Sequence, residues 1–144
     1  MNYYILFRYL HLVSIFIVVG SVFAQQFLVK TAVDKQLLKR ILLTDAIYGI
    51  ASVLTVTFGM ILWFVVGKPP EFYSNSNTFW IKMSLFIIVG ILSLYPSLFY
   101  FKSKKAKTAL IHIPQKLIMV LRIEAALLLI IPFFAELMAF GVTF

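Results

Sequence analysis

Cysteine is absent from all 144 residues of the chain, and charged side chains are scarce. Without cysteine the protein can form no disulfide, thiol nucleophile, thiolate-bound iron–sulfur cluster or covalent c-type haem. Only 12% of the residues are charged, against roughly a quarter in a soluble domain. The sequence also has no glycine-rich phosphate-binding loop and no nucleic-acid-binding motif. Its net charge of +8 therefore needs another explanation than nucleic acid.

Apolar residues, by contrast, make up 62% of the chain, and most fall into four long runs. The runs cover about residues 3–29, 42–67, 79–100 and 117–140. Each reaches the length of roughly 20 residues that a membrane-crossing helix needs. The first run is longer than the core of a signal peptide, so we expect a retained helix. We predict an all-α, integral membrane four-helix bundle, with residues 1–144 forming a single transmembrane domain.

Positive charge is concentrated after the first and third runs, whereas the segment after the second run has only Lys68, offset by Glu71. Lysine and arginine mark cytoplasmic segments, so we predict a multi-pass membrane protein with both termini outside. Attraction to anionic lipid also explains the positive charge, which makes the bilayer the expected partner and excludes nucleic acid. The basic residues are Lys30, Lys35, Lys39 and Arg40 after the first run, and Lys102, Lys104, Lys105, Lys107 and Lys116 after the third.

His11 and Lys82 are ionisable residues inside the first and third runs, where a bilayer makes buried charge costly. With both termini outside, His11 lies about two turns from the outer end of its helix, or roughly 12 Å at 1.5 Å per residue. Lys82 lies about one turn from the outer end of its helix. Both then occupy the outer half of the bilayer and can face each other, whereas His112 lies in a cytoplasmic segment.

Small and polar residues recur at spacings of three and four along the first three helices, so each set shares one face. In lipid such faces turn toward other helices, and we expect them to line the interior. The sets are Tyr4, Arg8, His11, Ser14, Val18, Ser21 and Gln25; Asp45, Tyr48, Ser52, Thr55 and Gly59; and Lys82, Phe86, Gly90, Ser93 and Ser97.

Three roles are open to His11: a hydrogen bond to a neighbouring helix, ligation of haem iron, or a protonation switch. Zinc or copper would need a cluster of His, Cys or carboxylate ligands, which does not accompany it. Lys82 can extend its ammonium to the membrane surface, pair with Glu136, bind a propionate or another anion, or coordinate iron as a neutral amine.

A second charged group lies near the cytoplasmic ends of the helices and consists of Asp45, Arg122 and Glu124. One interpretation is a structural ion pair that fixes helix register, and the other is a proton or ion path. A path needs polar groups at mid-membrane, where only serine and threonine are available. Both interpretations are open at this point.

Five short segments of the chain resemble a bacterial domain-of-unknown-function family of four-helix inner-membrane proteins. That family is distantly similar to the HemJ-type protoporphyrinogen oxidases, which have an early histidine in helix one and a Trp-x-Lys or Trp-x-x-Lys near the start of helix three. His11 and Lys82, which follows Trp80, match these two positions, whereas the HemJ-type pattern between helices one and two is missing. The segments are Arg8-Tyr9-Leu10-His11, Thr44-Asp45-Ala46-Ile47-Tyr48-Gly49, Phe79-Trp80-Ile81-Lys82, Tyr95-Pro96 and Arg122-Ile123-Glu124.

The resemblance implies non-covalent haem b, with His11 as the axial iron ligand and Lys82 as a second ligand or a propionate partner. Arg8, Trp80 and Phe86 complete the predicted cofactor-binding residues. The expected function is electron transfer or haem and porphyrin handling, and an enzyme of this kind would be a haem-dependent oxidoreductase. The alternative is a cofactor-free small transporter or assembly protein with a polar intramembrane network. We also predict a homodimer, because a haem is wide relative to the interior of one bundle and two-fold oligomers are common.

Overall fold

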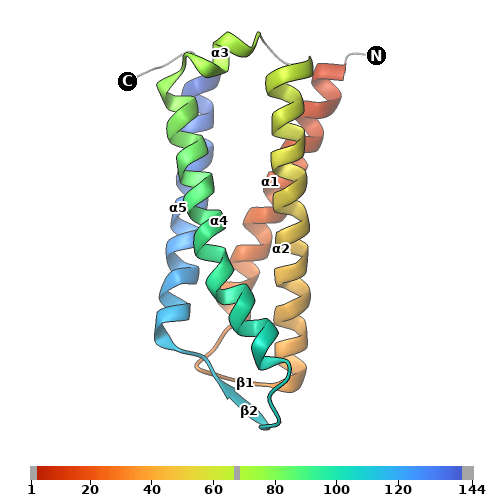
Figure 1. Ribbon diagram of the computed structural model, residues 1–144, viewed down its shortest axis with the longest axis vertical. Helices are drawn as coiled ribbons and strands as arrows, with labels where there is room; N and C mark the ends of the chain where they lie inside the picture. The colour runs from red at the N-terminus through yellow and green to blue at the C-terminus, as the bar shows by residue number, and fades with distance from the viewer. Residues whose placement is uncertain (1–2, 67–68, 141–144) are drawn as a thin grey trace.

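The computed structural model describes residues 3–66 and 69–140, and its four long helices run side by side (Figure 1). Each of the four is long and apolar enough to cross a membrane, which confirms the predicted all-α four-helix fold. Lys68, which entered the prediction of topology, lies outside the described residues. In chain order the elements are α1 (Tyr3–Leu28), β1 (Ala32–Asp34), α2 (Lys35–Ile61), the π-helix η1 (Leu62–Val66), α3 (Pro70–Ser74), α4 (Asn77–Ser103), β2 (Leu110–His112) and α5 (Gln115–Ala139).

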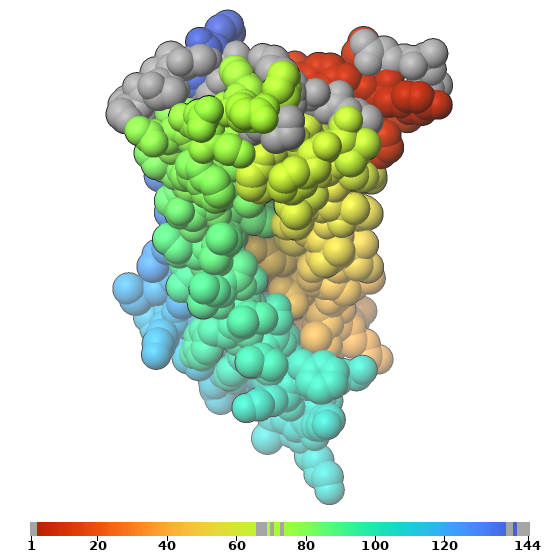
Figure 2. All heavy atoms as spheres, turned by 45° about the horizontal axis from the view of Figure 1, so that its top comes forward, coloured from red at the N-terminus to blue at the C-terminus, as the bar shows by residue number. Residues whose placement is uncertain are grey.

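The helices form two hairpins, since α1 packs mainly along α2, and α4 packs mainly along α5. The hairpins meet through α1 and α5, while α2 and α4 contact each other much less. Figure 2 shows α2 and α4 side by side across one face of the molecule. One end of the bundle carries β1 and β2, and the opposite end carries α3 together with the start of α1 (Figure 1). We call these the strand end and the α3 end.

The strand end joins the two lysine-rich segments through a short antiparallel pairing of β1 with β2, in which Val33 lies opposite Ile111. Both side chains are buried in an apolar cluster that also includes Ile41 and Leu117. Two segments far apart in the sequence are thereby fixed at one end, as the charge asymmetry requires. The sequence did not predict these strands, because three residues are too few to display an alternating pattern.

Helix α2 begins at Lys35, earlier than the apolar run that starts at residue 42. Asp34 caps its first turn, because a carboxylate oxygen of Asp34 accepts a hydrogen bond of 2.7 Å from the backbone N–H of Leu37. Ser76 caps α4 in the same way through the backbone N–H of Phe79. The apolar runs locate the spans, whereas polar capping residues decide where the helices begin.

The predicted interior faces are correct for α1 and α2 at most positions, but they are wrong at Arg8 and Gly90, which are exposed. On α4 the buried face includes Val89 and Pro96 instead of Gly90. Most residues of α4 outside its predicted interior face are apolar, so polarity alone does not decide which of them turns inward. Contacts with α5 decide it for α4, since Val89 packs in a cluster with residues of the other helices.

Candidate functional site

His11 lies on α1 near the α3 end, and its ring bonds to the backbone of α2. The distance between Nδ1 of His11 and the carbonyl oxygen of Thr55 is 2.9 Å. A carbonyl oxygen only accepts, so Nδ1 carries the hydrogen and donates it. In a neutral imidazole with this tautomer, Nε2 is left with its lone pair. The ring is therefore oriented by one helix while its second nitrogen remains able to accept a hydrogen bond or bind a metal.

Gly59, one turn after Thr55, allows the His11 ring to lie against the backbone of α2. A Cβ atom at Gly59 would be 3.1 Å from Cε1 of His11 and 3.5 Å from its Nδ1. Such a contact is tighter than ordinary van der Waals packing, so the absence of a side chain at Gly59 makes the approach possible. The seat of His11 thus consists of the Thr55 carbonyl and Gly59, both on the face of α2 that the sequence predicted to be interior.

Lys82 lies on α4, close enough for its charge to act on His11 across the bundle. Its Nζ atom is 5.7 Å from the centroid of the Phe79 ring, which is within the range of a cation–π interaction. Lys82 is half-buried, and no carboxylate among the described residues pairs with it. The pairing with Glu136 that the sequence allowed is therefore not formed, and Glu136 is exposed.

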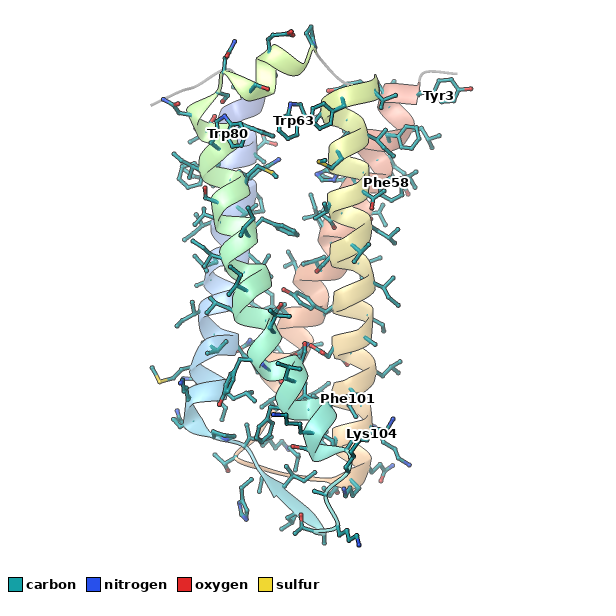
Figure 3. The ribbon with its side chains drawn as sticks, viewed as in Figure 1. Tyr3, Phe58, Trp63, Trp80, Phe101 and Lys104 are labelled. Carbon is teal, nitrogen blue, oxygen red and sulfur yellow. The ribbon has the colours of Figure 1, made fainter. Side chains whose placement is uncertain are left out.

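Beside Lys82, four aromatic residues form what we call the aromatic cluster: Trp63, Phe72, Phe79 and Trp80. Trp63 contacts Phe79 and Trp80 edge to face, with ring centroids 4.8 Å and 5.9 Å apart. The indole nitrogens of both tryptophans donate to Ser74 of α3, to its hydroxyl from Trp63 and to its carbonyl from Trp80. Figure 3 shows Trp63 and Trp80 close together at the α3 end. The cluster connects η1, α3 and α4 at this end.

The structure thus brings His11, Lys82 and Trp80 to one end of the bundle. Phe86 is half-buried one turn further along α4, while Arg8 is exposed on α1. The sequence predictions of the site did not include Trp63. The sequence could have indicated Trp63, because an indole near the end of a hydrophobic run is typical of the membrane interface.

Near the strand end a second set of polar residues, which we call the inner polar cluster, receives side chains from all four helices. Its members are Gln25 on α1, Asp45 and Tyr48 on α2, Tyr100 on α4, and Glu124 on α5. Arg122 does not belong to it, because this side chain is exposed, whereas Glu124 is 2% exposed. The ion pair considered from the sequence is therefore not formed, since residues two apart on a helix point in different directions.

A family model described as a predicted membrane protein (DUF2214) matches residues 4–143, which is nearly the whole chain. No curated protein and no solved structure gives a match. The family description supports the membrane-spanning architecture and names no activity, substrate or cofactor. None of these matches is a HemJ-type protein, so that resemblance rests on His11 and on the spacing of Trp80 and Lys82.

Proposed function

The chain belongs to this family of predicted membrane proteins, and we propose that it binds one haem b non-covalently at the α3 end, with His11 as the axial iron ligand. The observation that supports the proposal is the hydrogen bond from Nδ1 of His11 to the Thr55 carbonyl. Metal-bound histidines donate their other ring N–H to a carbonyl or carboxylate, which fixes the tautomer and the ring orientation. In His11 the bond to the Thr55 carbonyl provides this orientation and leaves Nε2 for the metal.

The chemistry of the donor set favours haem over a bare metal ion. Among the described residues there is no group of three or more His, Cys, Asp or Glu side chains that could hold a metal. A porphyrin supplies the equatorial nitrogens itself and needs only axial ligands from the protein. One histidine with a free Nε2 is enough for this cofactor and too little for structural zinc.

Lys82 and the nearby aromatic residues fit the remaining parts of a haem. The Lys82 ammonium can pair with a propionate, or the neutral amine can serve as a second iron ligand. Trp80 and Phe86 offer apolar surface for the ring, and exposed Arg8 offers a second cation for a propionate. The α2 and α4 helices share few contacts, so a planar ring that enters between the hairpins displaces chiefly the contacts of Trp63 with Phe79 and Trp80.

Bound haem would supply one-electron redox chemistry, while the protein residues hold the ring, orient the iron ligand and exclude water. The corresponding functions are electron transfer or haem and porphyrin handling. The resemblance of His11 and Trp80-x-Lys82 to the HemJ-type oxidases makes a haem-dependent oxidoreductase the finer form of this proposal. A homodimer would cover the lipid-facing edge of the ring, and native mass spectrometry from mild detergent would detect it as a haem-loaded dimer.

The test is the absorption spectrum of protein purified after expression with ample haem. We expect a Soret band in the wild type and its loss in His11→Ala. His112→Ala is the matched control, because His112 is exposed on β2 at the opposite end and should leave the band unchanged. A colourless wild-type protein, or a His11→Ala variant with the full band, would contradict haem ligation by His11. Lys82→Met separates the two roles of Lys82, since an unchanged spectrum excludes iron ligation and leaves propionate binding.

A cofactor-free membrane transporter is the second candidate, and the inner polar cluster is the observation that favours it. This cluster encloses two carboxyl groups within the membrane-spanning part of the bundle. Its chemistry does not depend on haem at the α3 end. A colourless, folded wild-type protein would leave this candidate as the better description.

A further inference from the structure

The inner polar cluster contains a directed chain of hydrogen bonds that ends on a carboxyl group. Tyr100 donates its hydroxyl hydrogen to Oε1 of Gln25 over 3.2 Å. This bond fixes the amide of Gln25, whose Nε2 then donates to Oδ1 of Asp45 over 3.4 Å. Three helices thereby hold one oxygen of Asp45 in place, and the hydrogen that reaches it comes from a neutral amide.

Glu124, on the fourth helix, is the unusual member of the cluster. Its side chain is 2% exposed, and its Oε1 atom has no hydrogen-bond partner. Among the described residues, Asp45 is the charged group whose field reaches Glu124, so two acidic side chains influence each other inside the bundle. Leaving a buried carboxylate without a partner is costly in a protein and more so within a membrane.

No cation compensates these two carboxyl groups among the described residues. Gln25 is the neutral contribution of α1, and α4 contributes Tyr100 and the hydroxyls of Ser93 and Ser97. Helix α2 contributes Tyr48 and Asp45 itself. On α5 the nearest basic residue is Arg122, whose side chain is exposed. Lys35 instead donates to backbone carbonyls at the end of α4 and beyond it, at Ser103, Lys104 and Ala106.

We propose that the inner polar cluster is a proton-binding site, in which Glu124 holds one exchangeable proton. A buried carboxyl group that lacks a hydrogen-bond partner and lies in the field of a second carboxyl group is costly to ionise, and one bound proton removes that cost. The proton adds to a carboxylate oxygen and leaves as a hydronium ion, so no bond other than O–H changes. A metal cation fits less well, because it needs several oxygen ligands whereas the fixed neighbour of Asp45 is an N–H donor.

A cavity of about 240 Å³ gives this site a route to the strand end. The cavity lies between α1 and α5 and reaches Gln25, the residue that donates to Asp45. Polar and aliphatic side chains both line it, and it is large enough for water, so a proton can arrive through it. Residues that line it include Gln26, Lys30, Thr31, Gln115 and Arg122. By the distribution of lysines this end is the cytoplasmic one, so the site would exchange protons with the cytoplasm.

Infrared spectroscopy of the protein in lipid nanodiscs tests this proposal directly. We expect the wild type to show the carbonyl stretch of a protonated carboxyl group at pH 7, where exposed carboxyl groups, with a pKa of about 4, are ionised. The band should shift when H₂O is replaced by D₂O and should be lost in Glu124→Gln. Glu136→Gln is the matched control, because Glu136 is an exposed glutamate on the same helix and its loss should leave the band unchanged.

Three results would overturn the proposal. The first is the absence of a protonated carboxyl band in the wild type at pH 7, and the second is a band that does not respond to D₂O. The third is a band that NaCl removes and choline chloride does not, because the site would then take Na⁺ instead of a proton. Asp45→Asn provides a second variant should Glu124→Gln fail to fold, and it should shift the band of Glu124. The measurement involves no haem, so its outcome is independent of the proposed function.

Discussion

The two ends of the bundle are built in opposite ways. At the strand end the β1–β2 pairing and a large buried apolar cluster hold the helices together, and polar groups are enclosed between all four of them. At the α3 end Phe79 is the buried member of its apolar cluster among the described residues, and Trp63, Phe72 and Met83 pack around it only partly buried. The strand end therefore has the larger buried core, while the apolar cluster at the α3 end is mostly half-buried.

This difference follows from the chemistry of the residues at each end. Medium-sized aliphatic side chains such as Val33, Ile41 and Leu117 form the buried cluster of the strand end. Large aromatic rings occupy the α3 end and meet edge to face, as Trp63 and Phe79 do. The inner polar cluster thus lies toward the aliphatic end, whereas His11 and Lys82 lie toward the aromatic one.

The comparison predicts, first, that the two ends lie on opposite sides of the membrane. Because the chain has no cysteine, single cysteines report their own position without background. Lys104→Cys, exposed at the strand end, should react with an impermeant thiol reagent only after the membrane is opened. Glu71→Cys, exposed in α3, should react in intact cells. The reverse labelling pattern would invert the topology derived from the lysines.

Filling the space at Gly59 should abolish the seat of His11. In Gly59→Leu the new side chain displaces the ring from the Thr55 carbonyl, since even a Cβ would be 3.1 Å from Cε1. We expect about a tenfold or greater loss of bound haem, as for other groups that orient a metal-bound histidine. Haem absorbance per protein measures this. Gly49→Leu is the control, because nothing lies within 4 Å of a Cβ at Gly49 on the same helix. Equal haem contents in the two variants would count against this role of Gly59.

Removing buried aliphatic volume at the strand end should weaken the scaffold. Ile41 is 0% exposed, and in Ile41→Ala the cavity left behind should lower the free energy of unfolding by on the order of 2 kcal/mol. Ile50 is 64% exposed on the same helix, so Ile50→Ala should change the free energy of unfolding by less than about 0.5 kcal/mol. Steric-trapping measurements in bicelles give both values. Similar losses for the two would mean that the strand end is not held by its buried cluster.

The smallest effect concerns the start of α2. Asp34→Ala removes the acceptor for the backbone N–H of Leu37 and should cost about 1 kcal/mol of stability. Asn is an equally good capping residue, so Asp34→Asn should retain nearly all of that stability. Thermal unfolding in detergent, followed by circular dichroism, compares the variants. If Asp34→Asn loses as much stability as Asp34→Ala, the charge of Asp34 matters more than its hydrogen bond to the backbone N–H of Leu37.

Sequence alone determined the spans and the ends at which the polar residues lie. A helix satisfies its own backbone in lipid, so length and hydropathy identify each crossing, and lysine counts predict which loops share a side. The spans and the sides of the loops together place His11 and Lys82 at one end, near enough to interact. The position of Asp45 and Glu124 toward the opposite end follows from the same facts.

Tertiary structure alone decided which side chains meet. Sequence did not distinguish Glu124, which is buried, from Arg122, which is exposed, because both lie on a helix with apolar residues on every side. Nor did it show that the His11 ring would bond to the Thr55 carbonyl or that Val33 would pair with Ile111. Lipid solvates all apolar faces equally, so helix rotation is set by close packing between helices, and that depends on all four at once.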